Sequence, residues 1–550
     1  MNQSTSVGGT LKLESSSTFD NLDPGATYEA TTWNLYRLFD RTLLAFKQEP
    51  GSTGLQVEGD LAKTWTGSNS NKTWTVTLVP NAKYSDGNTI TAQDVAYAIE
   101  RSNYAPDTIT GGPTYFKNLL DDTGNYQGPY KDPTGHVSGI TVQNATTIVF
   151  NLNQSFADFP YLLTLPQTTP IEKAKDPGKS YGTDIKGDSF TGQYMVSSYN
   201  PQSSLDLVPN PDFDASSDPN GVHKRYASAV NISLGVNGST VDQNLLQGSS
   251  NLDIHGLGVS TGTQSIVLAN PKDKANADVA QSGGNEYMQV NTQLKPFDNI
   301  NCRQAVEWAI NKTQVQDVSG GASAGGQIAT TVLPPTNTGY KAADQYATGG
   351  EQGDLAKAQS LFNTCKAQEG GSFNPSFTLA TYDKESHPKF AAAAEVVEQN
   401  LDKVGFNVTI QEYNYSTAFF QTAAGLPSFA DSSSHRIGLS LWAWYADFPT
   451  GYGFMDQILT KAGISQNGSS YDLSYWDSST FDNDLSEALA AGTPAETQAD
   501  YAKADAYAMS QAVIVPLLYM SNLLYRPPNT TNVTVSQAYG AYDYSIIGTK

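Results

Sequence analysis

GLSLWAWYADFPTGYGFMDQIL, residues Gly438–Leu459, is the stretch around which the chain is organised. Its first residues alternate apolar side chains with small ones, as at Leu439 and Leu441, and this pattern predicts a buried strand. Pro449 and Gly451 then end the strand. The stretch therefore predicts a strand inside a core, with a turn directly after it.

One carboxylate, Asp447, lies at the end of this strand within a cluster of aromatic residues. A lone acid in such surroundings is costly unless a cation meets it, because burial removes water from the charge. No Lys or Arg lies between Arg436 and Lys461, so the neighbouring sequence supplies no cation. Two interpretations stay open: an ordinary Asp turn after a strand, or a site for the ammonium group of a ligand. The aromatic residues of the cluster are Trp442, Trp444, Tyr445 and Phe448.

Length and charge narrow the class of protein. At 550 residues the chain is too long for one core, so two or three domains are expected. The formal net charge of −22 argues against nucleic acid as a partner and against an anionic membrane surface. No apolar run reaches the length of about 18 residues that a membrane-spanning helix needs. The composition favours a soluble protein with neutral or cationic ligands.

The first ten residues, MNQSTSVGGT, have neither a basic segment nor an apolar core, so they do not form a signal peptide. We expect them to be the mature end of an exported protein whose leader was replaced by Met1. A polar tail fits the same composition equally well.

The chain has two cysteines, Cys302 and Cys365. Each falls on the apolar side of a helical pattern, which allows the two thiols to meet. We predict a disulfide between them, and two buried free thiols are the alternative.

The order of elements in the second half predicts an α/β fold. SFTLAT at 376–381 and NVTIQEY at 407–413 have strand patterns, and residues 390–404 between them have a helical one. This βαβ order predicts a parallel sheet. Spacing predicts a helix over 31–46 and a buried strand at VIVPLLY, 513–519. Because no repeat or low-complexity linker divides the chain, we expect interleaved domains.

Motifs for catalysis are weak. Gly258–Gly262, GVSTG, matches the GxSxG nucleophile elbow with Ser260 as the nucleophile. The chain is rich in Gly and Ser, no clear strand precedes the motif, and we expect no apolar helix after Ser260. None of the five His is paired at metal spacing, and HExxH and CxxC are absent. A secreted hydrolase stays an alternative, and no cofactor is predicted.

Residues 210–221, NPDFDASSDPNG, bring several oxygen donors together, as a cation-binding loop does. The loop lacks the bidentate Glu and the full spacing of an EF-hand. We expect a polar surface loop, with calcium as the alternative. The donors are Asp212, Asp214, Asp218 and Asn220.

Several stretches together resemble the peptide- and nickel-type (family 5) solute-binding proteins of ABC importers. Their order and spacing cover almost the whole chain, and DFPTGYGF is closest to the actinobacterial branch. The matching stretches are LDP (22–24), DLAKTW (60–65), YSDGNTITAQDVAYAIER (84–101), TGQYMV (191–196), PFDNINCRQAVEWAINK (296–312), WAWYADFPTGYGF (442–454) and VIVPLLY (513–519).

The resemblance implies an α/β fold of two lobes, a periplasmic-binding-protein-like clamp of type II that encloses its ligand. It implies a discontinuous core of the first lobe, an extra domain inserted in that lobe, and a second lobe. The expected bounds are 1–50, 187–289 and 506–550 for the core, 51–186 for the inserted domain, and 290–505 for the second lobe.

The resemblance also implies roles for individual residues. In peptide-binding members the Asp at the position of Asp447 pairs with the α-ammonium group of the ligand, and Trp444 and Tyr445 would wall the ligand with Trp442 as support. The segment after LDP would face the ligand with its backbone groups. Its residues carried over here are Tyr28, Glu29 and Thr31.

We therefore expect an extracellular, non-enzymatic protein that hands oligopeptides to the membrane subunits of an ABC importer. A monomer is expected, on the cell surface or in the periplasm, with a lipid anchor in the precursor. The alternatives are a different solute in the same clamp (an oligosaccharide, a metal chelate or an opine-like compound), a secreted hydrolase, and a signalling receptor subunit.

Overall fold

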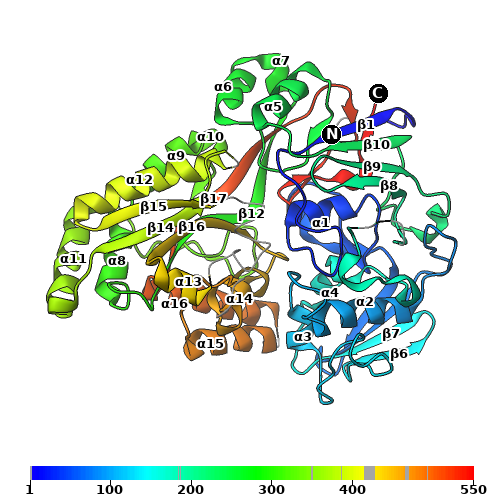
Figure 1. Ribbon diagram of the computed structural model, residues 1–550, viewed down its shortest axis with the longest axis horizontal. Helices are drawn as coiled ribbons and strands as arrows, with labels where there is room; N and C mark the ends of the chain where they lie inside the picture. Colours follow the sequence, from blue (N-terminus) through cyan, green and yellow to red (C-terminus); the bar gives the residue numbers. More distant parts are fainter. Residues whose placement is uncertain are drawn as a thin grey trace. The chain divides into compact units, whose positions relative to one another are not determined.

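The computed structural model describes residues 3–183, 185, 188–348, 351–385, 387–413, 428–464, 470–491 and 493–550. The chain forms two compact units (Figure 1). Unit 1 consists of Met1–Asp278 and Leu524–Lys550, and unit 2 is Val279–Leu523. The chain leaves unit 1 within the strand β12 (Ala277–Val290) and returns within β17 (Ile514–Tyr525).

The main sheet of unit 1 has the strand order β11-β1-β10-β9-β8. Strand β1 is parallel to both β10 and β11, whereas β9 is antiparallel to β10 and β8. Leu11 and Leu13 alternate with more exposed residues along β1, so one face of this strand lies in the core. The strands are β1 (Thr10–Glu14), β8 (Tyr194–Asn200), β9 (Ser204–Pro209), β10 (Ala229–Ser233) and β11 (Leu252–Asp253).

A second sheet of unit 1 is antiparallel, with the order β4-β5-β7-β6. Helix α2 (Ala92–Tyr104) contacts β6 and β7, and a capping box of Thr91 and Asp94 begins it. This sheet falls within the predicted inserted domain, but the three-part division of the chain stays a prediction. The strands are β4 (Ala62–Ser68), β5 (Thr73–Leu78), β6 (Ile140–Asn144) and β7 (Thr147–Asn151).

The remaining elements of unit 1 are short. Its further helices are α1 (Ala30–Tyr36), α3 (Tyr115–Leu119), α4 (Phe159–Leu162), α5 (Gly238–Gln247), α6 (Thr261–Ala269) and α7 (Pro271–Lys274). Its strand pairs are β2 (Leu44–Phe46) with β3 (Val57–Gly59), β18 (Thr530–Thr531) with β21 (Gly548–Thr549), and β19 (Val535–Ser536) with β20 (Ala541–Tyr542).

The predicted helix over 31–46 is correct only for its first six residues. Helix α1 ends at Tyr36, and Leu44–Phe46 instead form β2, which pairs with β3. Between them the buried Arg41 donates hydrogen bonds to Asp60 and Ser217. Tertiary partners therefore override the helical spacing of the apolar residues.

Unit 2 is built on a six-stranded sheet with the order β13-β17-β12-β16-β14-β15. Strand β14 is parallel to β15 and β16, and β16 is antiparallel to β12. The buried strand predicted at 513–519 is confirmed by β17. The strands not yet given are β13 (Gln327–Ile328), β14 (Ser376–Tyr382), β15 (Asn407–Tyr413) and β16 (Ile437–Tyr445).

The βαβ unit predicted for 376–413 is confirmed. Helix α12 (Pro388–Val404) connects the parallel strands β14 and β15 and runs along them in Figure 1. Gly405 ends the helix with a φ of 114°, a left-handed conformation that glycine adopts without steric cost. A side chain there would also press on the ring of Phe362.

The other helices of unit 2 include α8 (Ile300–Ala309) and α11 (Leu355–Glu369), which pack against each other. A disulfide joins them through Cys302 and Cys365, whose Cα atoms lie 5.4 Å apart. None of the helices in the described part of the chain has the length and apolar character needed to cross a bilayer. The remaining helices are α9 (Lys312–Val318), α10 (Gly321–Ala324), α13 (Phe429–Ser434), α14 (Gly451–Leu459), α15 (Ser479–Ala490) and α16 (Pro494–Gln511).

Candidate functional site

The first group of predicted site residues lies at the carboxyl end of β16, in unit 2. This strand runs between β12 and β14, so its backbone is bonded on both sides. In the ladder with β12, Trp442 is opposite Tyr287 and Tyr445 is opposite Gly284. Ligands of open α/β sheets bind beyond the carboxyl ends of parallel strands, and the parallel pair β14–β16 has that end here.

Trp442 and Trp444 lie on the same face of β16 but differ in their surroundings. Trp442 is fully buried, and its indole N–H donates a hydrogen bond of 3.0 Å to Gln289. The ring of Trp444 lies 6.2 Å from that of Trp442 and 5.6 Å from that of Tyr471. Both indole rings are therefore buried, Trp442 completely and Trp444 with 6% of its surface exposed.

Asp447 and Tyr445 are both half-buried at the turn that follows β16. The backbone N–H of Asp447 donates to the carbonyl of Gly453 at 3.0 Å. Thr450 caps helix α14 by accepting a hydrogen bond from the Gly453 N–H. Any side chain at Gly453 would overlap Phe448, so the turn requires glycine there. The backbone that carries Asp447 is thus fixed from both sides of the turn.

The second group, Tyr28, Glu29 and Thr31, belongs to unit 1, and all three residues are half-buried. Tyr28 and Glu29 precede helix α1, whereas Thr31 lies in its first turn. Asp20 accepts a hydrogen bond of 2.5 Å from the Tyr28 N–H. Burial raises the pKa of Asp20 to about 6, although this backbone bond lowers it. The ring of Tyr28 stacks on Trp33 at 5.8 Å.

Sequence reasoning missed the side chain that holds the turn before Tyr28. Arg101, on α2, is fully buried and donates to both carboxylate oxygens of Asp23, at 2.7 and 2.9 Å. The carbonyl of Asp23 in turn accepts from the N–H groups of Ala26 and Thr27. Arg101 also pairs with Asp176 at 3.1 Å. Asp23 and Arg101 both lie in stretches that resemble the family, LDP (22–24) and the stretch 84–101. This shared resemblance was the only sign in the sequence that the two residues could act together.

The GxSxG match does not form a nucleophile elbow. Strand β11 ends at Asp253, well before Ser260, so no strand leads into the serine. The Ser260 hydroxyl donates to the Asp242 carboxylate at 2.5 Å. The expectation that no apolar helix follows Ser260 is wrong, because α6 begins at Thr261 and carries Ile266 and Val267.

The acidic loop 210–221 uses its side chains to hold its own backbone. Asp214 accepts from the Ser216 N–H, and Asp218 accepts from the N–H groups of two following residues. Asp218 is buried, so the loop is only partly at the surface. No group of three or more His, Cys, Asp or Glu in the described ranges is arranged to hold a metal ion.

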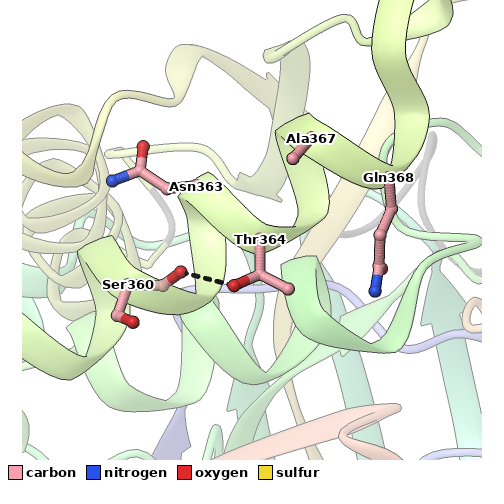
Figure 2. Close-up of a pocket in the computed structure, with 5 residues that line it drawn as sticks. All are labelled: Ser360, Asn363, Thr364, Ala367 and Gln368. Carbon is pink, nitrogen blue, oxygen red and sulfur yellow. Dashed lines mark hydrogen bonds between the residues drawn. The ribbon is translucent and has the colours of Figure 1, made fainter.

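A depression of about 570 Å³ lies on one face of helix α11. Figure 2 shows its polar side chains along the helix, with the Thr364 hydroxyl bonded to the Ser360 carbonyl at 2.9 Å. It is wide open, and none of the predicted site residues lines it. Its lining residues are Ser360, Asn363, Thr364, Ala367 and Gln368.

Comparison with known proteins gives relatives over most of the chain. The "Probable D,D-dipeptide-binding periplasmic protein DdpA" of Escherichia coli is 25% identical over 507 residues, covering 90% of this chain and 86% of that protein. The structure titled "Clavulanic acid biosynthesis oligopeptide binding protein 2" is 32% identical with a TM-score of 0.90, covering 100% of this chain and 97% of that one. A Helicobacter pylori structure, DppA in complex with the peptide STSA, is 21% identical with a TM-score of 0.75 and 98% coverage of both chains.

The likeness to the solved structures supports the predicted α/β fold of the periplasmic-binding-protein type. A family model, "Bacterial extracellular solute-binding proteins, family 5 Middle", matches residues 56–466, which is well over half of the chain. The sequence resemblance, the sheet order and this match agree, and the chain belongs to the family 5 bacterial extracellular solute-binding proteins.

Proposed function

We propose that the chain is an extracellular solute-binding protein that delivers oligopeptides to an ABC importer. The observation that carries the proposal is the family match over residues 56–466. It is supported by relatives whose names specify dipeptides or oligopeptides, and by a related structure solved with a peptide. Enclosure of the ligand between two lobes, which the family resemblance implies, stays a prediction.

Within this function, Asp447 is the partner of the α-ammonium group of the peptide. Its half-buried position on a fixed turn supports the role, because a side chain carried on an ordered backbone loses less freedom when it meets a cation. Trp444 and Tyr445 flank the ligand, and the buried Trp442 keeps Trp444 in place. In unit 1 the backbone around Tyr28, Glu29 and Thr31 contacts the peptide main chain.

Replacing the carboxylate tests this assignment. We expect Asp447→Ala and Asp447→Asn to weaken binding of a free-amine peptide by about 2–5 kcal/mol, the cost of removing one partner of a desolvated charge pair. N-acetylation of the peptide should weaken wild-type binding to a similar degree and have little further effect on either variant. Isothermal titration calorimetry measures all of these affinities.

A matched control for Asp447→Ala is Asp477→Ala, which also removes one negative charge from unit 2. Asp477 is exposed and pairs only with the exposed Lys461 among the ion pairs described, so peptide affinity should not change. If Asp447→Ala binds the free-amine peptide as the wild type does, Asp447 does not hold the ammonium group.

The ligand itself can be identified by native mass spectrometry of the purified protein, before and after denaturing release. We expect bound masses that fragment as peptides. A sugar oligomer or a metal chelate as the released species would instead support the alternative solutes for the same fold.

We further propose that the protein is a non-enzymatic monomer, anchored by lipid in its precursor, that docks on importer membrane subunits. The relatives are named as binding proteins, which supports the absence of catalysis. The bond of the Ser260 hydroxyl to Asp242 supports it as well, because a nucleophilic serine is usually activated by a histidine or a lysine, and no described hydrogen bond joins Ser260 to either. Peptide or ester hydrolysis that disappears in Ser260→Ala would contradict this part of the proposal.

A further inference from the structure

Two polar residues extend the register of the parallel strands β1 and β11 in unit 1. Leu13 pairs with Leu252 and Glu14 with Asp253, and the strands end there. Ser16 and His255 each follow two residues after the end of their strand. Both therefore lie beyond the carboxyl ends of parallel strands, the edge of an open α/β sheet where ligands bind.

Ser16 and His255 form a short hydrogen bond, 2.6 Å between the serine Oγ and the histidine Nδ1. Ser16 is exposed, whereas His255 is only 8% exposed. The backbone of His255 is fixed as well, because its N–H donates to the Asp253 carboxylate at 2.9 Å. A buried, oriented imidazole thus holds the hydroxyl group of an exposed serine.

The loop that carries His255 packs on the segment predicted to face the ligand. Gly256 has a φ of 81°, and a Cβ added there would stand 3.0 Å from the methyl group of Thr31. The chain therefore turns directly after His255 and lies against the first turn of α1. Gly256 follows His255 directly and contacts Thr31, so the Ser16–His255 pair lies near Thr31 although His255 is far from Thr31 in the sequence.

The charges around the pair are unfavourable for an anion. Burial lowers the pKa of His255 to about 4, so the imidazole is neutral near pH 7. The pKa of Asp253 is raised to about 7, chiefly by burial; the hydrogen bond from the His255 N–H opposes the rise, and the carboxyls of Asp242 and Glu14 add to it. Because the histidine is neutral near pH 7, the pair offers a ligand carboxylate no positive charge to bind.

We propose that Ser16 and His255 form a hydrogen-bonding subsite on unit 1 that takes an uncharged backbone amide of the bound peptide. This inference rests on the proposed function, and it adds a contact that the family resemblance did not supply. The 2.6 Å bond, the exposure of Ser16 and the contact of Gly256 with Thr31 carry it.

The chemistry of the pair explains why a backbone amide fits. If the Ser16 hydroxyl donates to Nδ1, the lone pairs of its oxygen accept from a ligand N–H. If Nδ1 carries the proton and donates to Ser16, the hydroxyl is available to donate to a ligand carbonyl. A peptide unit offers both an N–H and a carbonyl, so it matches either tautomer of His255.

The test uses the full chain and a pool of random tetrapeptides with free amino termini. A second pool carries an N-methyl group on each internal backbone amide. We expect Ser16→Ala to lower affinity for the first pool about 3- to 10-fold, the effect of one neutral hydrogen bond. N-methylation should then cost the wild type more affinity than it costs Ser16→Ala. Titration calorimetry gives the affinities, and thermal unfolding shows that the variants are folded.

Ser17→Ala is the matched control, because the hydroxyl of Ser17 donates to the neighbouring Thr18 carbonyl and has no described bond to His255. We expect it to bind as the wild type does. In a His255→Phe background, Ser16→Ala should cause little further loss, because the histidine acts through the serine.

The outcomes separate the two proposals. Equal affinities of wild type, Ser16→Ala and Ser17→Ala would overturn the subsite and leave the proposed function standing. Binding of no peptide by the wild type would overturn the proposed function together with the subsite. A Ser16→Ala loss that appears with a pool of tetrapeptides containing Lys or Arg, and disappears with a pool lacking both, would overturn the assignment to a backbone amide.

Discussion

At the scale of single residues, Glu286 is an unusual presence in the sheet of unit 2. It lies on β12 opposite Ala443, is 3% exposed, and its Oε1 has no hydrogen-bond partner among the described residues. Burial raises the pKa of Glu286 to about 8, although the positive charge of Lys389 acts to lower it. Burial lowers the pKa of Lys389, although the negative charge of Glu286 acts to raise it. Each charge is thus only weakly compensated by the other.

A stability measurement tests the state of Glu286. Its pKa is higher in the folded chain than its ordinary value of 4.5, so folding takes up a proton between those values. The stability it contributes is complete below pH 4.5 and is lost as the pH rises through 8. Glu286→Gln should therefore be more stable than the wild type at pH 8, by on the order of a few kcal/mol, and nearly equal at pH 4.5. Urea unfolding at the two pH values measures both differences.

The comparison variant for Glu286→Gln is Glu487→Gln, which changes an exposed acid of the same unit. We expect this variant to follow the wild type at both pH values. A Glu286→Gln protein whose gain in stability is the same at pH 4.5 and pH 8 would show that packing, and not protonation, produces the difference.

At the scale of elements, helix α2 stabilises the segment before α1 through a contact between residues far apart in the chain. Arg101 is the last basic residue of α2, and its paired hydrogen bonds to Asp23 join residues 78 positions apart in the chain. Two parallel bonds between a guanidinium and a carboxylate fix both distance and angle. We expect Arg101 to position the backbone of residues 28–31 in this way.

Arg101→Lys keeps the charge but removes the paired geometry. We expect weaker peptide binding, by about 3- to 10-fold, because the segment after Asp23 is less well fixed. Arg41→Lys is the control, since Arg41 is an equally buried arginine of unit 1 that binds Asp60 and not Asp23. Calorimetric titration with a free-amine peptide distinguishes the two. Equal losses in both variants would mean that Arg101 acts only through the stability of unit 1.

Elements whose signals are local could be predicted from the sequence, and those set by distant partners could not. The strands and helix of 376–413 follow from periodicity and from the Gly405 stop, as the structure confirms. Helix α14 was not predicted, because Pro449 and Gly451 indicate a break in regular structure. The cap that begins the helix, the bond from the Gly453 N–H to Thr450, forms only when the turn is folded. In the site, the aromatic cluster around Asp447 is visible in one stretch of sequence. Arg101 and His255 act through residues far away in the chain, which spacing does not show.

At the scale of the whole molecule, the disulfide and the division into two units make a joint prediction. The bond between Cys302 and Cys365 closes a loop inside unit 2 alone. Cys302→Ala with Cys365→Ala should lower the stability of unit 2 by about 2–4 kcal/mol through the freer unfolded chain. Differential scanning calorimetry should show a downward shift of one component and leave the component of unit 1 in place. A uniform shift of the whole transition would show that the two units unfold together.

The two crossings of the chain also bear on how the protein is made. Unit 1 needs Leu524–Lys550, where Asp543 pairs with Arg37 at 2.8 Å, while unit 2 is one continuous stretch. The chain emerges from its N-terminus first, both at the ribosome and during the export that the proposed function requires, so Arg37 emerges hundreds of positions before the carboxylate that neutralises it. The N-terminal part of unit 1 therefore stays incompletely packed until the last residues have emerged, whereas unit 2, as one continuous stretch, is complete before then. We expect chaperones to bind the emerging chain through this N-terminal part of unit 1.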